Sequence, residues 1–244
     1  MKAIILAAGY ATRLKPLFDV WGYTVPKPLL PLGEKALLDH ILEKIIPLSP
    51  TQVYVVTNDQ FYSYFVAWSR KVTYPFSVKI ISDGTSSNET RLGAIGDIKY
   101  VVEKEKISED LLVIAGDNYF EFNLAELKSL FYEKKKTVLA LWDSKDLSFA
   151  KKRFGVASIN AENKIIGFEE KPEEPKTSLV STACYIFSAE HLSYLSEVQK
   201  DNLGELVRHI SEKDAVYGCV FPDQWCDIGT PEQYNLLAEQ FFKK

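Results

Sequence analysis

The sequence lacks long hydrophobic runs and is poor in cysteine, histidine and methionine. Its 244 residues include three Cys, three His and one Met. No stretch reaches the roughly 18 consecutive apolar residues that a membrane-spanning helix needs, so we expect no membrane contact. Cys184, Cys219 and Cys226 form no Cys-x-x-Cys pair and no even set of disulfide partners. This cysteine usage favours reduced thiols in a cytoplasmic protein.

An excess of positive charge is also missing. Lys and Arg total 29 against 33 Asp and Glu, which gives a net charge of −4. This balance argues against a surface that coats nucleic acid, so we expect no nucleic-acid partner. A polyanionic ligand therefore needs a local group of Arg and Lys. Apolar residues, in contrast, make up 46% of the chain, which is enough for a substantial core.

Short apolar runs alternate with helical patterns over the first 142 residues. The expected strands are 2–7, 53–57, 78–82, 111–115 and 138–142, and the expected helices are 36–46, 59–70, 92–103 and 124–134. Strands that are apolar throughout and separated by helices indicate a parallel sheet covered on both faces. We therefore predict a Rossmann-like, three-layer α/β/α fold with a mixed, mainly parallel sheet.

The pattern changes after residue 142. Segments 154–159 and 164–168 read as a hairpin, strands are expected at 180–187 and 215–221, and helices near 189–199 and 203–211. Thr230, Pro231 and Gln233 have the spacing of a helix start, with Thr230 as the N-cap. We predict a small antiparallel lobe around residues 154–187, added to the α/β part of one domain.

Two loops follow expected parallel strands and carry unusual residues. Ligands of open α/β sheets collect at the carboxyl ends of the strands, which here are the loops after Leu6 and Ala115. The first loop reads LAAGYATRLKPL from Leu6, and its small residues let the backbone approach phosphate while Arg13 supplies a charged fork. Further on, Lys27 is held between two prolines. The dinucleotide fingerprint and the Walker A motif are both absent.

Two aspartates stand at ends of expected strands. Asp117 follows the apolar run 111–115, and Asp227 follows the strand expected at 215–221. Taken alone, each is as often a turn former or a helix cap as a ligand. Together they offer the carboxylate oxygens that Mg²⁺ takes alongside substrate phosphates.

At this point the sequence resembles the sugar-phosphate nucleotidyltransferase family. The first loop and the segment PKPLLP from Pro26 match that family's signature, and four more elements follow in the family's order. These are Ala115-Gly116-Asp117-Asn118, Phe154-Gly155-Val156, Glu170-Lys171-Pro172 and Trp225-Cys226-Asp227-Ile228-Gly229-Thr230, with the strand around Thr182 between the last two. The matching elements cover nearly all of the chain.

The resemblance implies a Mg²⁺-dependent transferase in nucleotide-sugar biosynthesis, which joins an NTP to a small phosphorylated substrate, here a sugar 1-phosphate. The expected domain is 1–244, with a nucleotide-binding part (1–142) and a sugar-phosphate-binding part (143–244). The residues implied are catalytic Arg13, Lys27 and Lys171; nucleotide-binding Leu6, Ala7, Ala8, Gly9, Asn88, Leu92, Gly93 and Gly116; substrate-binding Asn118, Gly155, Glu170, Lys171 and Thr182; and the metal ligands Asp117 and Asp227.

The chain departs from the family at three places. Ala11 stands where the signature has glycine, which costs about 1 kcal/mol if that position needs a positive φ. The segment 82–96 matches the family's Gly-rich base-reading segment only loosely, so the sequence names no base. Few residues follow Gly229, so we expect a short form without a C-terminal β-helix, active as a monomer or small homo-oligomer.

Two other functions fit the same residues. Short relatives transfer a cytidylyl group to phosphocholine or an alditol phosphate, and Asp117-Asn118 would suit them as well. The chain also fits a non-catalytic regulatory subunit that binds a nucleotide or sugar phosphate, because fold alone does not define function. The latter function predicts loss of a metal ligand or a phosphate-binding cation, whereas Asp117, Asp227, Arg13 and Lys27 are all present.

Overall fold

The computed structural model describes residues 1–199 and 201–242. In this part of the chain nine strands form the main sheet, in the order β10-β9-β11-β6-β1-β4-β5, with β8 beside β11 and β12 beside β8. The strands are β1 (Lys2–Leu6), β4 (Val53–Thr57), β5 (Val78–Ser82), β6 (Leu111–Ala115), β8 (Val138–Asp143), β9 (Gly155–Ile159), β10 (Ile165–Glu170), β11 (Leu179–Phe187) and β12 (Tyr217–Phe221).

The sheet is mixed, as predicted. Strand β1 pairs in parallel with β4 and β6, and β4 pairs in parallel with β5. Strand β11 then runs antiparallel to both β6 and β8, while β12 is parallel to β8. The hairpin β9–β10 is antiparallel and joins the sheet through β11. Strand β11 thus makes one continuous sheet of the parallel part and the antiparallel part.

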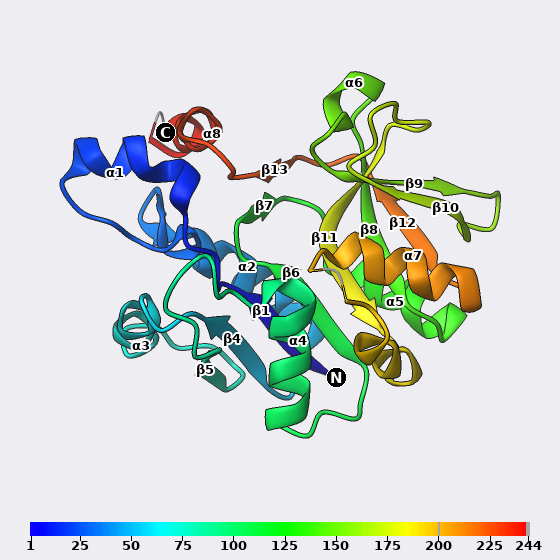
Figure 1. The fold of residues 1–244 in the computed structure, drawn as a ribbon, viewed down its shortest axis with the longest axis horizontal. Helices are drawn as coiled ribbons and strands as arrows, with labels where there is room; N and C mark the ends of the chain where they lie inside the picture. Colours follow the sequence, from blue (N-terminus) through cyan, green and yellow to red (C-terminus); the bar gives the residue numbers. More distant parts are fainter. Residues whose placement is uncertain (200, 243–244) are drawn as a thin grey trace.

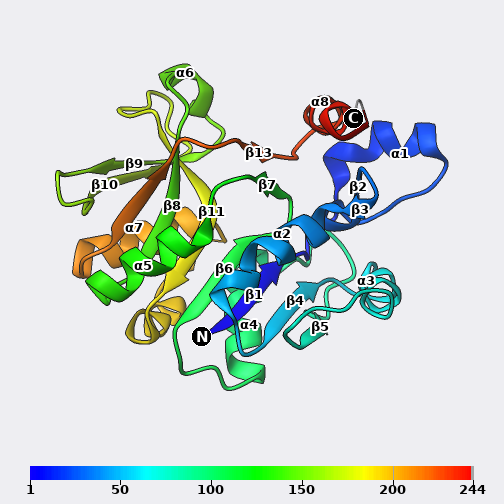
Figure 2. The same ribbon diagram turned by 180° about the vertical axis from the view of Figure 1, so that it is seen from behind.

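Helices cover both faces of this sheet. They are α1 (Lys15–Trp21), α2 (Leu37–Ile45), α3 (Tyr62–Ser69), α4 (Gly93–Lys104), α5 (Leu124–Lys134), α6 (Leu147–Ala150), η4 (Ala189–Ser196), α7 (Leu203–Lys213) and α8 (Pro231–Phe242). Successive strand residues point to opposite faces. Ile5 of β1 packs into the cluster that contains α2, α3 and α5, and Ile4 into the cluster that contains α4, η4 and α7 (Figures 1 and 2). The predicted three-layer fold is confirmed.

A short two-stranded ribbon pairs a segment in the middle of the chain with a segment near its C-terminal end. Strands β7 (Asn118–Phe120) and β13 (Trp225–Asp227) pair antiparallel, and the chain then continues into α8 beside α1 (Figure 1). The hydroxyl of Tyr234 in α8 donates to the carbonyl oxygen of Pro31 at 2.9 Å. Pro31 belongs to the small hairpin of β2 (Pro31–Leu32) and β3 (Lys35–Ala36). The C-terminal helix therefore packs on the first part of the fold.

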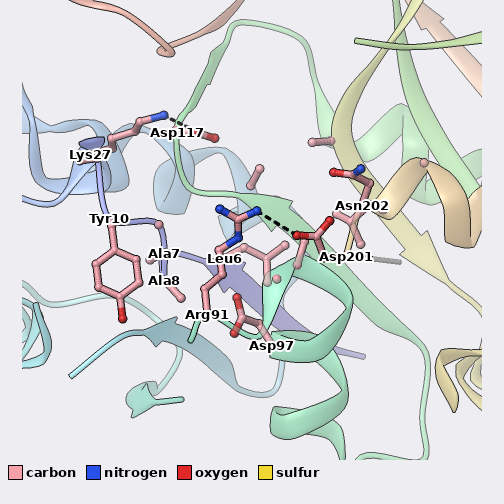
Figure 3. A pocket seen from close by; sticks show the side chains of 18 of the residues that line it. Leu6, Ala7, Ala8, Tyr10, Lys27, Arg91, Asp97, Asp117, Asp201 and Asn202 are labelled. Atoms are coloured by element: carbon pink, nitrogen blue, oxygen red, sulfur yellow. Dashed lines mark hydrogen bonds and ion pairs between the residues drawn. The ribbon is translucent and has the colours of Figure 1, made fainter. Parts of the chain in front are cut away.

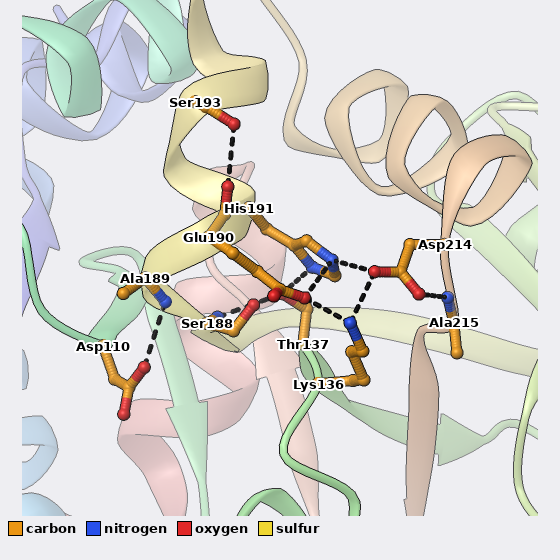
Figure 4. A network of polar contacts seen from close by, with 10 residues as sticks. All are labelled: Asp110, Lys136, Thr137, Ser188, Ala189, Glu190, His191, Ser193, Asp214 and Ala215. Carbon is orange, nitrogen blue, oxygen red and sulfur yellow. Dashed lines mark hydrogen bonds and ion pairs between the residues drawn. The ribbon is translucent and has the colours of Figure 1, made fainter.

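A polar network fixes the far end of the second part (Figure 4). The ring of His191, which is 1% exposed, hydrogen-bonds Thr137 Oγ1 at 2.8 Å and Asp214 Oδ2 at 3.1 Å. The Lys136 ammonium binds Asp214 at 2.6 Å and also pairs with Glu190. These hydrogen bonds from Lys136 and His191 hold the pKa of Asp214 well below its usual value. The network ties β8, η4 and the end of α7 together.

Most expected elements are present within a residue or two of their predicted ends. Helix α1 was not among the expected elements. Strand β8, at the proposed division near residue 142, pairs with β11 and β12 of the second part.

All three cysteines are free. No helix of the described residues is long and apolar enough to cross a membrane.

Candidate active site

The loop after β1 forms one wall of the main cavity. Ala7, Ala8, Gly9 and Ala11 line it with little or no side chain, and the Asn58 side-chain amide donates to the Ala8 carbonyl oxygen at 2.9 Å, which fixes the path of the loop. Ala11 has φ 53° and ψ 25°, in the left-handed region. The position where the family signature has glycine therefore does need a positive φ, at a strain cost of about 1 kcal/mol. Arg13 follows in a short 3₁₀ turn and also lines the cavity.

Lys27 is presented to the same cavity by the prolines beside it. Pro26 is extended, and Lys27 begins a 3₁₀ turn, η2 (Lys27–Leu29), whose second residue is Pro28. The Lys27 side chain is only 12% exposed, and its Nζ lies 2.9 Å from Asp117 Oδ2. The buried ammonium therefore lies directly beside the first predicted metal ligand (Figure 3).

The ribbon β7–β13 brings the two aspartates together. Asp227 pairs with Asn118, the residue after Asp117, and the Ile228 amide donates to the Asp117 carbonyl oxygen at 2.9 Å. Residues 110 positions apart in sequence thus become neighbours through three ladder pairs. The site needs this ribbon because the main sheet alone does not carry Asp227.

The charges around Asp227 show that the aspartates and cations form one group. Burial, together with the nearby charge of Asp117, raises the pKa of Asp227 to about 6. Lys27, Arg13 and Arg153 act in the opposite direction. Two carboxylates and three cations thus interact with one another at this end of the cavity, where an anionic ligand with a divalent cation would be electrostatically balanced.

Gly116 allows the strand carrying Asp117 to lie against the first loop. A Cβ at Gly116 would lie 2.7 Å from the Leu6 carbonyl oxygen and 2.9 Å from Pro28 Cγ. Neither neighbour is a flexible side chain. Glycine is therefore required here by close approach of the backbone, and the role of Gly116 in nucleotide binding stays a prediction.

The opposite end of the cavity contains a buried acid. Glu170 lines the cavity, and its carboxylate occupies the space that a Cβ at Gly204 would fill. Burial raises the pKa of Glu170, and the neighbouring charge of Lys171 partly offsets that effect. Lys171 itself is half-exposed, with φ 48° and with its Nζ 3.8 Å from Glu170 Oε1. Its ammonium group is mobile enough in principle to reach a ligand that Glu170 also contacts.

A bulge in β11 directs side chains into the cavity. The register shifts between Ser181 and Tyr185, and Ala183 between them has φ 56°. Ser181, Ala183 and Tyr185 all line the cavity. Thr182 is fully buried instead, and its hydroxyl donates to the Ala140 carbonyl oxygen at 3.0 Å. In this structure Thr182 supports the strand, and its neighbours face the cavity.

The predicted site residues divide into two sets among the described residues. Those that line one cavity are Leu6, Ala7, Ala8, Gly9, Arg13, Lys27, Asn88, Gly93, Asp117, Gly155 and Glu170. Those outside its lining are Leu92, Gly116, Asn118, Lys171, Thr182 and Asp227. Asn118 is buried and accepts a hydrogen bond from the Trp225 indole at 3.0 Å, so it stiffens the ribbon. Direct ligand contacts of this second set stay predictions.

Sequence reasoning assigned no role to several residues that line the cavity. They are Tyr10, Arg91, Asp97, Arg153, Ser181, Tyr185, Asp201 and Asn202. The guanidinium of Arg153 lies over the rings of Phe149 and Phe154, with Cζ at 5.1 and 4.8 Å from the ring centroids. The place of Arg153 directly before Phe154-Gly155-Val156 was the sequence signal that could have identified it as a lining residue.

The fold and the site together define an α/β protein in which a loop of mostly small residues, Arg13, Lys27, Asp117 and Glu170 line one cavity, and Asp227 lies beside Asp117. The nucleotidyl transferase family matches residues 2–243, and the chain belongs to this family.

Among similar proteins, a D-glycero-alpha-D-manno-heptose 1-phosphate guanylyltransferase of Campylobacter jejuni is 27% identical over 241 residues, covering 96% of this chain and 97% of that protein. A UTP–glucose-1-phosphate uridylyltransferase of Synechocystis is 29% identical, covering 96% of this chain and 61% of that protein. The chain spans about half the length of several other curated relatives.

Among solved structures, a UDP-glucose pyrophosphorylase in complex with UDP-glucose superposes with a TM-score of 0.84 at 19% identity, covering 99% of this chain and 98% of that one. This likeness concerns the fold.

Proposed function

We propose that this chain transfers the NMP group of an NTP to a sugar 1-phosphate, which yields an NDP-sugar and pyrophosphate. The observation that carries the proposal is that Arg13, Lys27, Asp117 and Glu170 line one cavity and that Asp227 lies beside Asp117 and interacts with the same cations. The guanylyl- and uridylyltransferases named among the relatives support a sugar phosphate as the acceptor.

Asp117 and Asp227 are the residues that would hold Mg²⁺. Two carboxylates suffice for this ion because it commonly completes its shell with substrate phosphates and water. When bound, Mg²⁺ supplies neutralisation of the charge on the α-phosphate. Until the ion arrives, the Lys27 ammonium 2.9 Å away neutralises part of the charge on Asp117.

The cations position the triphosphate. The small residues around Gly9 let loop amides approach its oxygens, while Arg13 and Lys27 offset the charge that passes to the pyrophosphate leaving group. The acceptor phosphate oxygen attacks the α-phosphorus, and the bond from phosphorus to the bridging oxygen breaks. A phosphomonoester is largely ionised at neutral pH, with a second pKa of about 6, so this attack needs no strong general base.

The acceptor lies at the end of the cavity formed by the second part of the chain. Glu170 accepts hydrogen bonds from sugar hydroxyls, and Lys171 and Arg153 attract the acceptor phosphate. Residues 1–142 thus bind the nucleotide and residues 143–244 the sugar phosphate, and the enzyme works as a monomer or small homo-oligomer. Three unpaired thiols fit a cytoplasmic location.

Pyrophosphate release with Mg²⁺ tests the proposal. Each common NTP is combined with sugar 1-phosphates, phosphocholine and alditol phosphates, and we expect release with one NTP and a sugar 1-phosphate. Asp117→Asn is expected to lower turnover about 100-fold or more, because charge neutralisation at the α-phosphate is lost. Exposed Asp223, four residues before Asp227, provides the matched control, and Asp223→Asn should leave turnover unchanged.

Two results would redirect the proposal. Release only with phosphocholine or an alditol phosphate would assign the chain to the other acceptor class. If folded protein binds NTP but releases no pyrophosphate with any acceptor, the chain is a binding subunit.

A further inference from the structure

A buried carboxyl group faces the cavity away from the aspartates described above. Asp97 lies one turn into α4 and is 6% exposed, yet it is among the residues that line the cavity. Its Oδ1 is buried and has no hydrogen-bond partner among the described residues. A buried charged group without a partner is costly, so Asp97 needs an explanation that packing does not give.

A second carboxyl group stands behind Asp97. Asp83 Oδ1 accepts hydrogen bonds from the Thr85 amide at 2.7 Å and the Thr85 hydroxyl at 2.8 Å, while its Oδ2 is buried without a partner. The Tyr10 hydroxyl in turn donates to Thr85 Oγ1 at 2.9 Å. The Thr85 amide and hydroxyl thus donate to Asp83 and the Tyr10 hydroxyl donates to Thr85, so none of these three donors hydrogen-bonds Asp97.

The neighbouring carboxyl group favours the protonated form of Asp97. Burial and the charge of Asp83 together raise the pKa of Asp97 to about 8. The nearby cation does not neutralise the pair, because Arg91 binds Asn88 Oδ1 at 3.2 Å and Asp201 Oδ2 at 3.3 Å. If protonated Asp97 donates to the unpartnered Oδ2 of Asp83, its other carboxyl oxygen stays a hydrogen-bond acceptor on a residue that lines the cavity.

The position of Asp97 matches the base of a bound nucleotide. Figure 3 shows Lys27 and Asp117 on one side of the loop residues Leu6–Ala8 and Asp97 on the other. A nucleotide whose phosphates lie with Lys27 therefore extends past this loop toward α4. Asp97 lies on α4, in the first part of the chain, which also supplies the loop from Leu6 to Ala8 and Lys27.

We propose that Asp97 accepts a hydrogen bond from an exocyclic amino group of the nucleobase, so that the chain selects ATP, CTP or GTP over UTP and dTTP. The inference rests on the proposed function. Adenine, cytosine and guanine each carry an amino donor, whereas uracil and thymine present a single N–H flanked by two carbonyl acceptors. If a carbonyl group of uracil or thymine faces Asp97, its oxygen and the Asp97 oxygen are both acceptors and form no hydrogen bond. A site whose acceptor expects an amino donor therefore binds such a base much more weakly.

Binding of the five nucleotides without any acceptor tests the inference. Isothermal titration calorimetry with Mg²⁺ and ATP, CTP, GTP, UTP or dTTP gives each dissociation constant. We expect at least one of the first three to bind about tenfold or more tighter than UTP and dTTP. In Asp97→Asn, whose amide offers a donor as well as an acceptor, that preference should fall to about threefold or less.

The control is Glu103→Gln, which changes an exposed carboxylate on the same helix and should keep the wild-type preference. The melting temperature of Asp97→Asn should be close to that of the wild type, because the Asn amide can donate to Asp83 as the protonated carboxyl group does. This readout also shows that the variant is folded.

The outcomes separate this inference from the proposed function. Tightest binding of UTP or dTTP would overturn the role of Asp97 and leave the transferase proposal intact. Equal weakening of all five nucleotides by Asp97→Asn would point to ribose contact or support of the loop, and would also overturn it. Binding of none of the five would refute both. A preference for ATP, CTP or GTP over UTP and dTTP that is lost in Asp97→Asn supports the inference even if no sugar phosphate reacts.

Discussion

At Gly116 a single missing side chain allows the site to form. The backbone of the strand carrying Asp117 passes within contact distance of the Leu6 carbonyl oxygen and Pro28. Both are rigid parts of the nucleotide half of the cavity. A side chain here would push the predicted metal ligand away from Lys27 and the phosphate loop.

We therefore expect Gly116→Ala to lower the free energy of unfolding by about 1–3 kcal/mol, since overpacking against backbone forces the strands apart. Turnover should fall as well, because Asp117 follows directly. Gly9→Ala is the stability control, because nothing lies within 4 Å of a Cβ at Gly9. Equal stability of the two variants in urea unfolding would show that the strand relaxes freely around residue 116.

At the scale of elements, the network around His191 holds β8, η4 and α7 in place and depends on an ionised Asp214. Because the pKa of Asp214 is lowered in the folded state, its contribution to stability is complete above the ordinary value of 3.8 and disappears as the pH falls below it. The sign follows from the hydrogen bonds donated by Lys136 and His191, which favour the carboxylate.

Asp214→Asn should therefore lower the free energy of unfolding by about 1–3 kcal/mol at pH 7, since the buried ring loses its charged acceptor. The difference from wild type should be constant from pH 5 to 7 and shrink below about pH 4. Denaturant unfolding at several pH values measures it, with Asp223→Asn as the control that shows no difference. A gap that persists unchanged at pH 3 would disprove the assignment.

Elements with strong periodicity were predictable from the sequence. The apolar strands β4, β5 and β6 have the predicted bounds, and so does α5. Helix α1 was missed although Pro16 at its start and Gly22 in the left-handed conformation after its end are ordinary helix signals. The strands of the β7–β13 ribbon have three residues each, too few for a period to show, and their partners are over 100 residues apart.

The site was predictable where a residue type alone defines the chemistry. Lys27, Arg13 and Asp117 were expected to share a cavity and do so. Asp97 could not be found in this way, because an Asp inside a helical pattern reads as solvated surface. Its significance depends on Asp83, which only the packing of α4 beside the end of β5 brings near.

For the whole molecule, one sheet runs through both proposed parts. Residues of β11 pair with Leu111–Ile114 of β6 on one side, where every paired residue is buried, and with β8 on the other. Separating the parts would therefore break ladders inside the core. The folding unit is the entire sheet, although the ligands are divided between its halves.

We accordingly expect one cooperative unfolding transition. Trp21 and Trp68 lie in the first part, Trp142 is the last residue of that part, and Trp225 lies in the second part. Tryptophan fluorescence therefore reports on the unfolding of both parts. Its midpoint in urea should coincide with that of far-ultraviolet circular dichroism. Two separated midpoints would show that the parts unfold independently and that β11 is a weak joint.

The β7–β13 ribbon also sets an order in time. During synthesis the phosphate loop, Lys27 and Asp117 leave the ribosome long before the segment that carries Asp227. The second carboxylate takes its place beside Asp117 only when β13 pairs with β7. A nascent chain that has not yet produced residue 227 therefore already contains the residues proposed to bind the triphosphate but only half of the predicted metal-binding pair, and on the proposed function the capacity for transfer arises in one of the last steps of its folding.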